Sequence, residues 1–378
     1  MNFRVVFSAL AITATGWIAG CQTQPVRQSA SAAVPSMVAA TTESPGEQRH
    51  ITIPVPFSWG GEVRCGIAGC LLAAVEHENG MVALHRIDKR KTMQLDRQKV
   101  AYHPDSAAWL EDDLFVAAVE ATASLDVFRV REQKLERLQQ IPVDFSPRDV
   151  VVVKAEQGRY TLLATPYSGK EVAWVLDWSV HDVRAPTVKK TRWCEAPWHP
   201  VKLTHARGID GPAVAAACLD DKRLVAVSLS NLLAPPIVLA NFPAVSRNAR
   251  PSPSGEWVYV SLETGARNAR VHMKTGELQW IQSPLTGSVS VAPLEDDLVI
   301  WGEDRELYLQ RLDAKGQVLE TRWQGVSGFA TRLQLLDIDH DGQKDVVVYN
   351  SGGEVIDVVY GPLWDGAKTE RPQRPRAR

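Results

Sequence analysis

Residues 335–349 read LLDIDHDGQKDVVVY, and this stretch is the strongest guide to the fold. Its carboxylates fall at positions 1, 3, 5 and 9 of a short loop: Asp337, Asp339, Asp341 and Asp345. Oxygen ligands at this spacing suit Ca²⁺, and Gly342 at position 6 permits the sharp turn that wraps an ion. Position 12 is Val348 where an EF-hand has a bidentate glutamate, and a β-branched run follows. The stretch therefore predicts a calcium loop that leads into a β-strand.

The loop resembles the calcium loop of FG-GAP/VCBS repeats, in which a D-x-D-x-D-G-x-x-D turn precedes a propeller strand. The resemblance implies a β-propeller blade near 324–363 and a structural Ca²⁺ that fixes this blade. It also implies the ligands, namely side-chain oxygens of Asp337, Asp339, Asp341 and Asp345 and the backbone carbonyl of Gln343. Calcium sites of extracellular modules are weak, with Kd values of about 10⁻⁴–10⁻³ M. The chain holds one clear copy of the loop.

The rest of the chain from Ile51 onward consists of short β-rich runs separated by turn residues. Apolar residues at helical spacing over three turns do not occur there, so we predict an all-β protein. The motif LEDDL at 110–114 recurs at 294–298, which is 184 residues later (294 − 110) or four units of about 46 residues. That is the length of a WD40-like blade, and Ser252–Ser261 resembles the turn and strand of TolB/WD40-like blades.

These features predict one β-propeller of about seven four-stranded blades within residues 50–363. The expected blades lie near 58–100, 101–143, 144–193, 194–242, 243–283, 284–323 and 324–363. Six or eight blades remain open, because 187–207 is irregular, and a β-sandwich with a small extra domain is the alternative fold. We expect Ile51–Val55 to close the ring by joining the last blade. The twelve tryptophans are assigned to packing between blades.

The N-terminus carries a targeting segment. Residues 1–20 combine Arg4 with an apolar run too short to span a bilayer permanently, which is typical of a signal peptide. The segment ends in Ile18-Ala19-Gly20-Cys21, which resembles the lipobox of bacterial lipoproteins. That resemblance implies cleavage before Cys21 and acylation of this cysteine. Gln22 follows where inner-membrane lipoproteins have aspartate, so an outer-membrane anchor is expected, with the body facing the periplasm or the exterior.

Two segments flank the expected propeller. Residues 21–49 are rich in Ser, Ala, Thr, Pro and Gln and should form a flexible tether after the lipidated cysteine. Residues 364–378 hold several arginines among prolines and are expected to form a disordered basic tail.

Four cysteines remain once Cys21 is assigned to lipid: Cys65, Cys70, Cys194 and Cys218. An even number in an exported protein predicts two disulfides. Three pairings are possible, and the local pairs Cys65–Cys70 and Cys194–Cys218 are preferred because each lies within one expected blade.

The sequence contains no nucleophile elbow, P-loop, H-E-x-x-H motif or dinucleotide fingerprint. A net charge of −2 argues against nucleic-acid binding. The one dense polar and aromatic patch, His199 and His205 near Trp193, Cys194 and Trp198, is interpreted as packing in preference to a metal or sugar site. We therefore expect a non-catalytic platform that binds an envelope protein or another ligand. The alternative is an enzyme or glycan-binding protein that uses the central channel. A platform predicts exposed apolar patches, and an enzyme predicts titratable groups around the axis.

Overall fold

The computed structural model describes residues 49–67, 69–167, 172–181 and 186–371. Within these ranges the regular structure is twenty-six strands and one short helix, α1 (Leu363–Gly366). No helix there is long and apolar enough to cross a membrane. The predicted all-β class is confirmed.

Five successive sheets each contain four consecutive antiparallel strands. The first two are β2 (Gly61–Gly66), β3 (Gly69–Glu76), β4 (Met81–Asp88) and β5 (Lys91–Lys99), then β6 (Pro104–Trp109), β7 (Leu114–Val119), β8 (Ser124–Arg131) and β9 (Lys134–Pro142). The third is β10 (Pro147–Glu156), β11 (Arg159–Pro166), β12 (Val172–Ser179) and β13 (Thr187–Arg192). The fourth and fifth are β14 (Pro197–Leu203), β15 (Ala213–Cys218), β16 (Arg223–Ser228) and β17 (Ile237–Asn241), then β18 (Val245–Pro251), β19 (Trp257–Glu263), β20 (Arg267–His272) and β21 (Leu278–Gln282).

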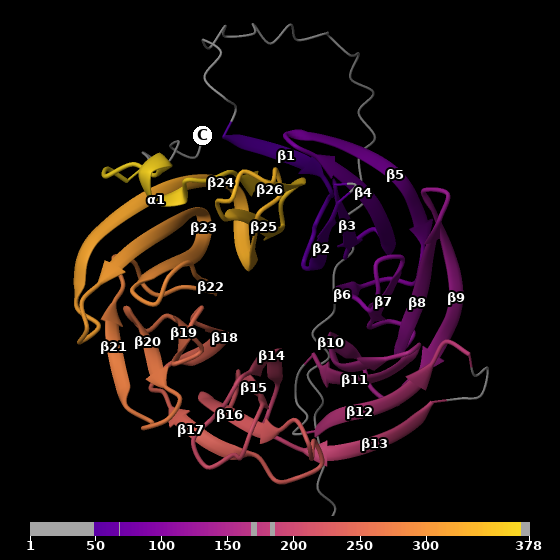
Figure 1. Cartoon of the computed structure of the whole chain (residues 1–378), viewed down its shortest axis with the longest axis horizontal. Coiled ribbons are helices and arrows are strands. Elements are labelled where there is room, and N and C mark those ends of the chain that lie inside the picture. The colour runs from indigo at the N-terminus through magenta and orange to yellow at the C-terminus, as the bar shows by residue number, and fades with distance from the viewer. Residues whose placement is uncertain (1–48, 68, 168–171, 182–185, 372–378) are drawn as a thin grey trace, which may run out of the picture. The chain divides into compact units, whose positions relative to one another are not determined.

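The sixth sheet has six strands, in the order β1-β26-β25-β24-β23-β22. Its strands are β1 (His50–Pro54), β22 (Ser290–Pro293), β23 (Leu298–Leu312), β24 (Val318–Leu336), β25 (Asp345–Ser351) and β26 (Val355–Val359). The sheets follow one another around a ring, with the first strand of each four-stranded sheet nearest the centre (Figure 1). In the sixth sheet β22 lies on the inside and β1 on the outside. The fold is a β-propeller.

The position of a strand in its sheet explains its composition. The second strands, such as LFVAAV in β7 and AVAAAC in β15, are buried along their whole length because neighbouring sheets cover both faces. The outer strands are charged and exposed, as TVKKTR in β13 shows. Lysine and arginine on an outer strand discourage edge-to-edge association with another chain.

Apolar clusters fill the seams between neighbouring sheets. Trp109 packs with Phe115 between the first and second sheets, and Trp174 and Trp178 lie between the second and third. Trp301 occupies the seam between the fifth and sixth sheets. These tryptophans pack between blades, as the sequence predicted.

The number of sheets differs from the expected seven. The two blades expected at 284–323 and 324–363 form one hydrogen-bonded sheet, because β24 is continuous through Ser327 and Gly328. Its first half pairs with β23 and its second half pairs with β25. The described residues nevertheless present seven inner segments to the axis: β2, β6, β10, β14, β18, β22 and the second half of β24.

The ring is closed by β1, as the sequence predicted. This strand pairs antiparallel with β26, from His50 opposite Val359 to Pro54 opposite Val355. The buried carboxylate of Asp357 fixes the closure, since it lies 2.7 Å from His50 Nε2 and accepts hydrogen bonds from Ser327 and Asn350. Four segments of the sixth sheet thus meet at one side chain.

The prediction of a disordered tail is wrong for residues 364–371. Leu363 and Ala367 are buried, and Lys368 forms a backbone bridge with Trp323. Trp364 has the guanidinium of Arg322 4.4 Å from its ring centroid, and Arg371 pairs with Glu306. Apolar and aromatic side chains among the basic residues hold this segment against the sixth sheet. Residues 372–378 lie outside the described residues.

Candidate functional site

The predicted calcium loop connects β24 to β25. Oxygen atoms of Asp337, Asp339 and Asp345 converge, all within 4.8 Å of one another. Asp345 is fully buried, and its carboxylate accepts the backbone N–H groups of Ile338 at 2.7 Å and Gly361 at 2.9 Å. Burial, with the nearby charge of Asp339, raises the pKa of Asp345. The loop gathers negative charge that a cation would neutralise.

The residues at this loop fit a calcium ion. Oδ1 of Asp339 is buried without a hydrogen-bond partner, and its Oδ2 lies 3.3 Å from the Arg90 guanidinium. A buried carboxylate oxygen without a donor is costly unless a cation is bound. Asp341 is outside the converging set, since its Oδ1 accepts the Gln343 N–H at 2.8 Å and shapes the turn. Three of the four predicted carboxylates therefore come together.

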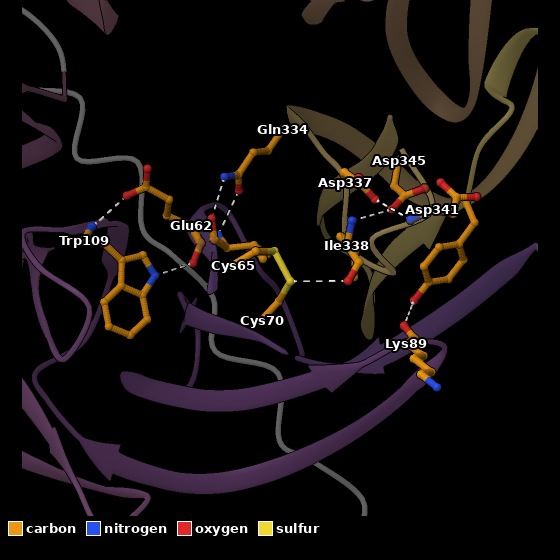
Figure 2. Close-up of a disulfide and its surroundings, with 12 residues drawn as sticks. Glu62, Cys65, Cys70, Lys89, Trp109, Gln334, Asp337, Ile338, Asp341 and Asp345 are labelled. Carbon is orange, nitrogen blue, oxygen red and sulfur yellow. Dashed lines mark hydrogen bonds between the residues drawn. A yellow bond between two sulfur atoms is a disulfide. The ribbon is translucent and has the colours of Figure 1, made fainter. Parts of the chain in front are cut away.

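The loop lies at the seam where the ring closes (Figure 2). Arg90 reaches Asp339 from the turn between β4 and β5, and Tyr360 Oη donates to the carbonyl of Lys89 in the same turn at 2.7 Å. The carbonyl oxygen of Ile338 lies 3.6 Å from Cys70 Sγ. The loop thus fastens the sixth sheet to the first.

The two preferred disulfides are confirmed. Cys65–Cys70 joins β2 to β3 in the first sheet, with the Cα atoms 4.0 Å apart. Cys194–Cys218 ties the segment before β14 to β15, with the Cα atoms 5.9 Å apart. The second bond is buried between the third and fourth sheets.

A central channel of about 620 Å³ is lined by the inner strands. Its charged lining residues are Glu62, Lys202, Arg250 and Arg332. Burial, together with the charge of Arg332, lowers the pKa of Arg250 to about 9. Burial also raises the pKa of Glu62. The channel lining is mostly apolar, and its charged residues include more basic than acidic groups.

The two histidines of the polar and aromatic patch, which the sequence assigned to packing, lie at opposite ends of β14. His199 pairs instead with Asp149 from β10. Nδ1 of His199 lies 3.2 Å from Asp149 Oδ1, and its backbone N–H donates to Asp149 Oδ2 at 3.0 Å. Burial lowers the pKa of His199 to about 4, so its imidazole is neutral at pH 7. Burial opposes ionisation of Asp149, but His199 and Arg148 outweigh it and lower the pKa of this carboxyl.

Arg148 is the centre of an aromatic cluster where the inner strands begin. Its guanidinium carbon lies 4.2 Å from the ring centroid of Trp198, 4.8 Å from Trp59 and 5.4 Å from Tyr167. Arg247 lies over Trp198 at 5.2 Å. Contacts of this kind are worth about 2 kcal/mol or more when desolvated, as Arg148 is.

A second titratable group adjoins Arg148. The fully buried Asp105 accepts a hydrogen bond from Arg148 Nη1 at 3.0 Å. Burial raises the pKa of Asp105 to about 8 although Arg148 opposes this shift. His77 lies beside it, with Nε2 3.4 Å from Asp105 Oδ1, and burial lowers its pKa too.

Sequence reasoning missed Asp105, Arg148 and Asp149. Asp105 lies on β6 in the second sheet, whereas Arg148 and Asp149 are neighbours on β10 in the third, so no local spacing connects Asp105 to the other two. A weak signal was present, since a proline followed by a charged residue recurs at Pro104 and Pro147, 43 residues apart (147 − 104). Equivalent positions in consecutive blades face the same part of the channel.

A groove of about 550 Å³ runs between the third and fourth sheets. Its apolar lining comes from strands of the third sheet, from the residue before β15 and from the segment after β16: Val153, Val175, Pro212, Leu229, Leu232 and Leu233. Leu233 is 43% exposed, and Thr191 Oγ1 of β13 donates to its carbonyl at 3.4 Å. Lys154 and Lys189 also line the groove.

The predicted lipidation site, Cys21, lies outside the described residues, as do the signal peptide and most of the tether. The structure therefore does not bear on these predictions.

The sequence matches no protein-family model and no curated protein. A solved structure with a similar fold is the β-propeller domain of Myceliophteria thermophila Cps50 (Swd1). The two share 11% sequence identity with a TM-score of 0.57, over 82% of this chain and 98% of that one. At this identity the likeness shows the fold alone, which is a β-propeller.

Proposed function

We propose that this protein is a non-catalytic binding platform, held at the cell envelope by lipid on Cys21 and carrying one structural Ca²⁺. A rigid ring offers binding surfaces on its faces and rim without catalytic residues. The lipobox-like sequence supports the anchor, and the converging aspartates support the calcium ion.

The observation that carries this proposal is the groove between the third and fourth sheets. It exposes apolar side chains on a framework fixed by the buried Cys194–Cys218 disulfide. An interface needs an apolar centre with a polar rim, and the groove offers Leu233 beside Lys154 and Lys189. We infer that its partner is a protein segment with apolar side chains flanked by acidic residues.

Photocrosslinking from defined positions tests the partner. A photoreactive amino acid at Leu233 should give one discrete adduct in intact envelopes, and the same residue at Leu319 should not. Leu319 is also exposed, at 65%, but lies on β24 in the sixth sheet. Replacing Lys189 by Glu should weaken the Leu233 adduct through charge repulsion. Equal labelling from both positions, or an adduct indifferent to Lys189→Glu, contradicts the proposal.

The anchor is tested separately. Cys21→Ser should abolish incorporation of radiolabelled palmitate and move the protein from the membrane to the soluble fraction. Several acyl chains provide far stronger membrane binding than a single chain. A Cys21→Ser protein that stays in the membrane contradicts the lipid anchor.

The central channel supports a second candidate, an enzyme or glycan-binding protein. The observation in its favour is the set of buried titratable groups on the inner strands, including Asp105 of β6 with a pKa of about 8 and Arg250 of β18 with a pKa of about 9. Shifted pKa values of this kind cluster at functional sites, although structural networks produce them too. A ligand of the channel should lose affinity on Arg250→Met, and a partner of the groove should not.

A further inference from the structure

A second cluster of metal-binding side chains lies away from the calcium loop. His77 follows β3, Asp105 belongs to β6, and Glu120 follows β7. Ligand atoms of these three residues all lie within 4.8 Å of one another. The calcium loop connects the inner half of β24 to the next strand outward, β25. His77 and Glu120 instead follow β3 and β7, which are the second strands of their sheets counted from the centre. The two clusters therefore lie at opposite ends of the sheets.

Two atoms of this cluster are buried without a partner. His77 Nε2 and Asp105 Oδ2 form no hydrogen bond with any described atom, and the side chains are 7% and 0% exposed. His77 Nε2 lies 3.4 Å from Asp105 Oδ1. A neutral imidazole nitrogen and a carboxylate oxygen are both acceptors, so this contact requires either a proton on the Asp105 carboxyl or a cation between the two groups.

The surrounding contacts orient these atoms as in a metal site. His77 Nδ1 lies 3.2 Å from Glu78 Oε1, which places the ring proton on Nδ1 and the lone pair on Nε2. Arg148 holds Asp105 Oδ1 at 3.0 Å and leaves Oδ2 free. His103 Nδ1 lies 3.3 Å from Glu120 Oε2. Outer partners of this kind fix the direction of metal ligands.

The backbone connects the same residues directly. The N–H of His103 donates to the carbonyl of His77 at 3.1 Å, and the N–H of Glu120 donates to the carbonyl of His103 at 2.9 Å. His103 adopts a φ of 56°, in the left-handed region that is unusual for residues other than glycine. The site is therefore formed before any ion binds.

We propose that His77, Asp105 and Glu120 bind a divalent first-row transition-metal ion, with Zn²⁺ as its probe. One imidazole and two carboxylates balance the charge of the ion, and imidazole favours Zn²⁺ over Ca²⁺. Bonds of about 2.0 Å in a tetrahedron separate neighbouring ligand atoms by about 3.3 Å. His77 Nε2 lies 3.4 Å from Asp105 Oδ1, the oxygen that also accepts from Arg148, and Oδ2 is the unpartnered oxygen of the same carboxyl group. Three protein ligands leave a fourth position for water or for an anionic group of a partner.

The test is metal titration of the full-length protein in detergent, stripped of metal and then kept in excess Ca²⁺ so that the calcium loop is filled. Zn²⁺ competed against a chromogenic chelator should bind at one site per chain. Co²⁺ should give the visible absorption of a four-coordinate ion. His77→Ala and Asp105→Asn should each weaken Zn²⁺ binding about a hundredfold or more.

Two further variants keep the test decisive. Glu120→Gln is isosteric and partly exposed, so it should fold normally and still weaken Zn²⁺ binding. His181→Ala removes an exposed histidine far from the cluster in sequence and should leave binding unchanged. If the wild-type protein takes up no Zn²⁺, the two unpartnered atoms share a proton and the metal site is refuted. Equal uptake by wild type, His77→Ala and Glu120→Gln would also refute it.

Discussion

His199 and Asp149 show how a single side chain can couple two inner strands. His199 lies near the start of β14, and Asp149 lies on β10 in the preceding sheet. The contact buries a neutral imidazole against an ionised carboxylate that Arg148 also stabilises. Because the fold disfavours protonation of His199, this pair should make stability depend on pH.

The pKa of His199 is about 4 in the folded protein against 6.5 for an unperturbed histidine, so its contribution to stability is complete above pH 6.5. It should be lost as the pH falls from 6.5 towards 4, by about 1.4 kcal/mol per pH unit. His199→Gln retains the backbone N–H that binds Asp149 but does not titrate. The loss of unfolding free energy between pH 7 and pH 4.5, measured by urea denaturation, should therefore be about 2–3 kcal/mol smaller in this variant. If wild type and His199→Gln lose the same unfolding free energy between pH 7 and pH 4.5, His199 is protonated as readily in the folded as in the unfolded protein, which contradicts the prediction.

At the scale of elements, the sequence predicts most strands correctly because the buried strands consist of short runs of apolar residues. The predicted runs Leu114–Val119 and Ala213–Cys218 coincide with β7 and β15. The last sheet is harder to predict, because β24 runs through Ser327 and Gly328 without a proline or Asn-Gly turn to separate two blades. β24 is continuous because it pairs with β23 on one side and β25 on the other, and such pairing cannot be predicted from the local sequence pattern.

The two disulfides should differ in their contribution to stability. The bonded cysteines are 5 residues apart in Cys65–Cys70 and 24 apart in Cys194–Cys218. Chain-entropy arguments give about 2 kcal/mol for the short loop and about 3.5 kcal/mol for the long one. Replacing Cys194 and Cys218 by alanine should therefore lower the unfolding free energy more than replacing Cys65 and Cys70. The opposite order, in denaturant titrations of the two double variants, would show that packing near the calcium loop outweighs chain entropy.

At the scale of the whole molecule, the calcium loop and β1 act on the same seam. β1 joins the sixth sheet, and Arg90 and Tyr360 connect the loop region to the first sheet. An open ring would expose the apolar cluster that contains Ile53, Leu72 and Ile338. Calcium binding should therefore stabilise the entire propeller.

Excess Ca²⁺ should raise the unfolding free energy by about 1.4–2.7 kcal/mol when its concentration is 10 to 100 times the Kd. Asp337→Asn should remove this gain, because it deletes one of the three converging carboxylates. Calorimetric Tm values with Ca²⁺ and with EDTA provide the measurement. Asp365→Asn is a matched control, since Asp365 is an exposed acid in α1 and should retain the full shift. No shift in the wild type would contradict a structural calcium ion.

The candidate sites differ in how far the sequence could foresee them. Asp337, Asp339 and Asp345 are close in the chain, so their spacing was sufficient. His77, Asp105 and Arg148 are brought together only by the closure of successive sheets around the axis, and the groove beside Leu233 depends on two sheets as well. A single sequence predicts where the strands lie, but it does not predict which loops of different blades become neighbours.

Hydroxyl-radical footprinting of the protein in native membranes, compared with the purified protein, tests the platform proposal most directly. The proposal predicts that Leu233, which is exposed in the structure, is protected in membranes and reactive after purification. Met93, exposed on β5, should react equally in both samples. Protection at Trp59 and Tyr102 with none at Leu233 would contradict the proposal, and would place the bound molecule at the aromatic stack that these residues form with His77 and His103.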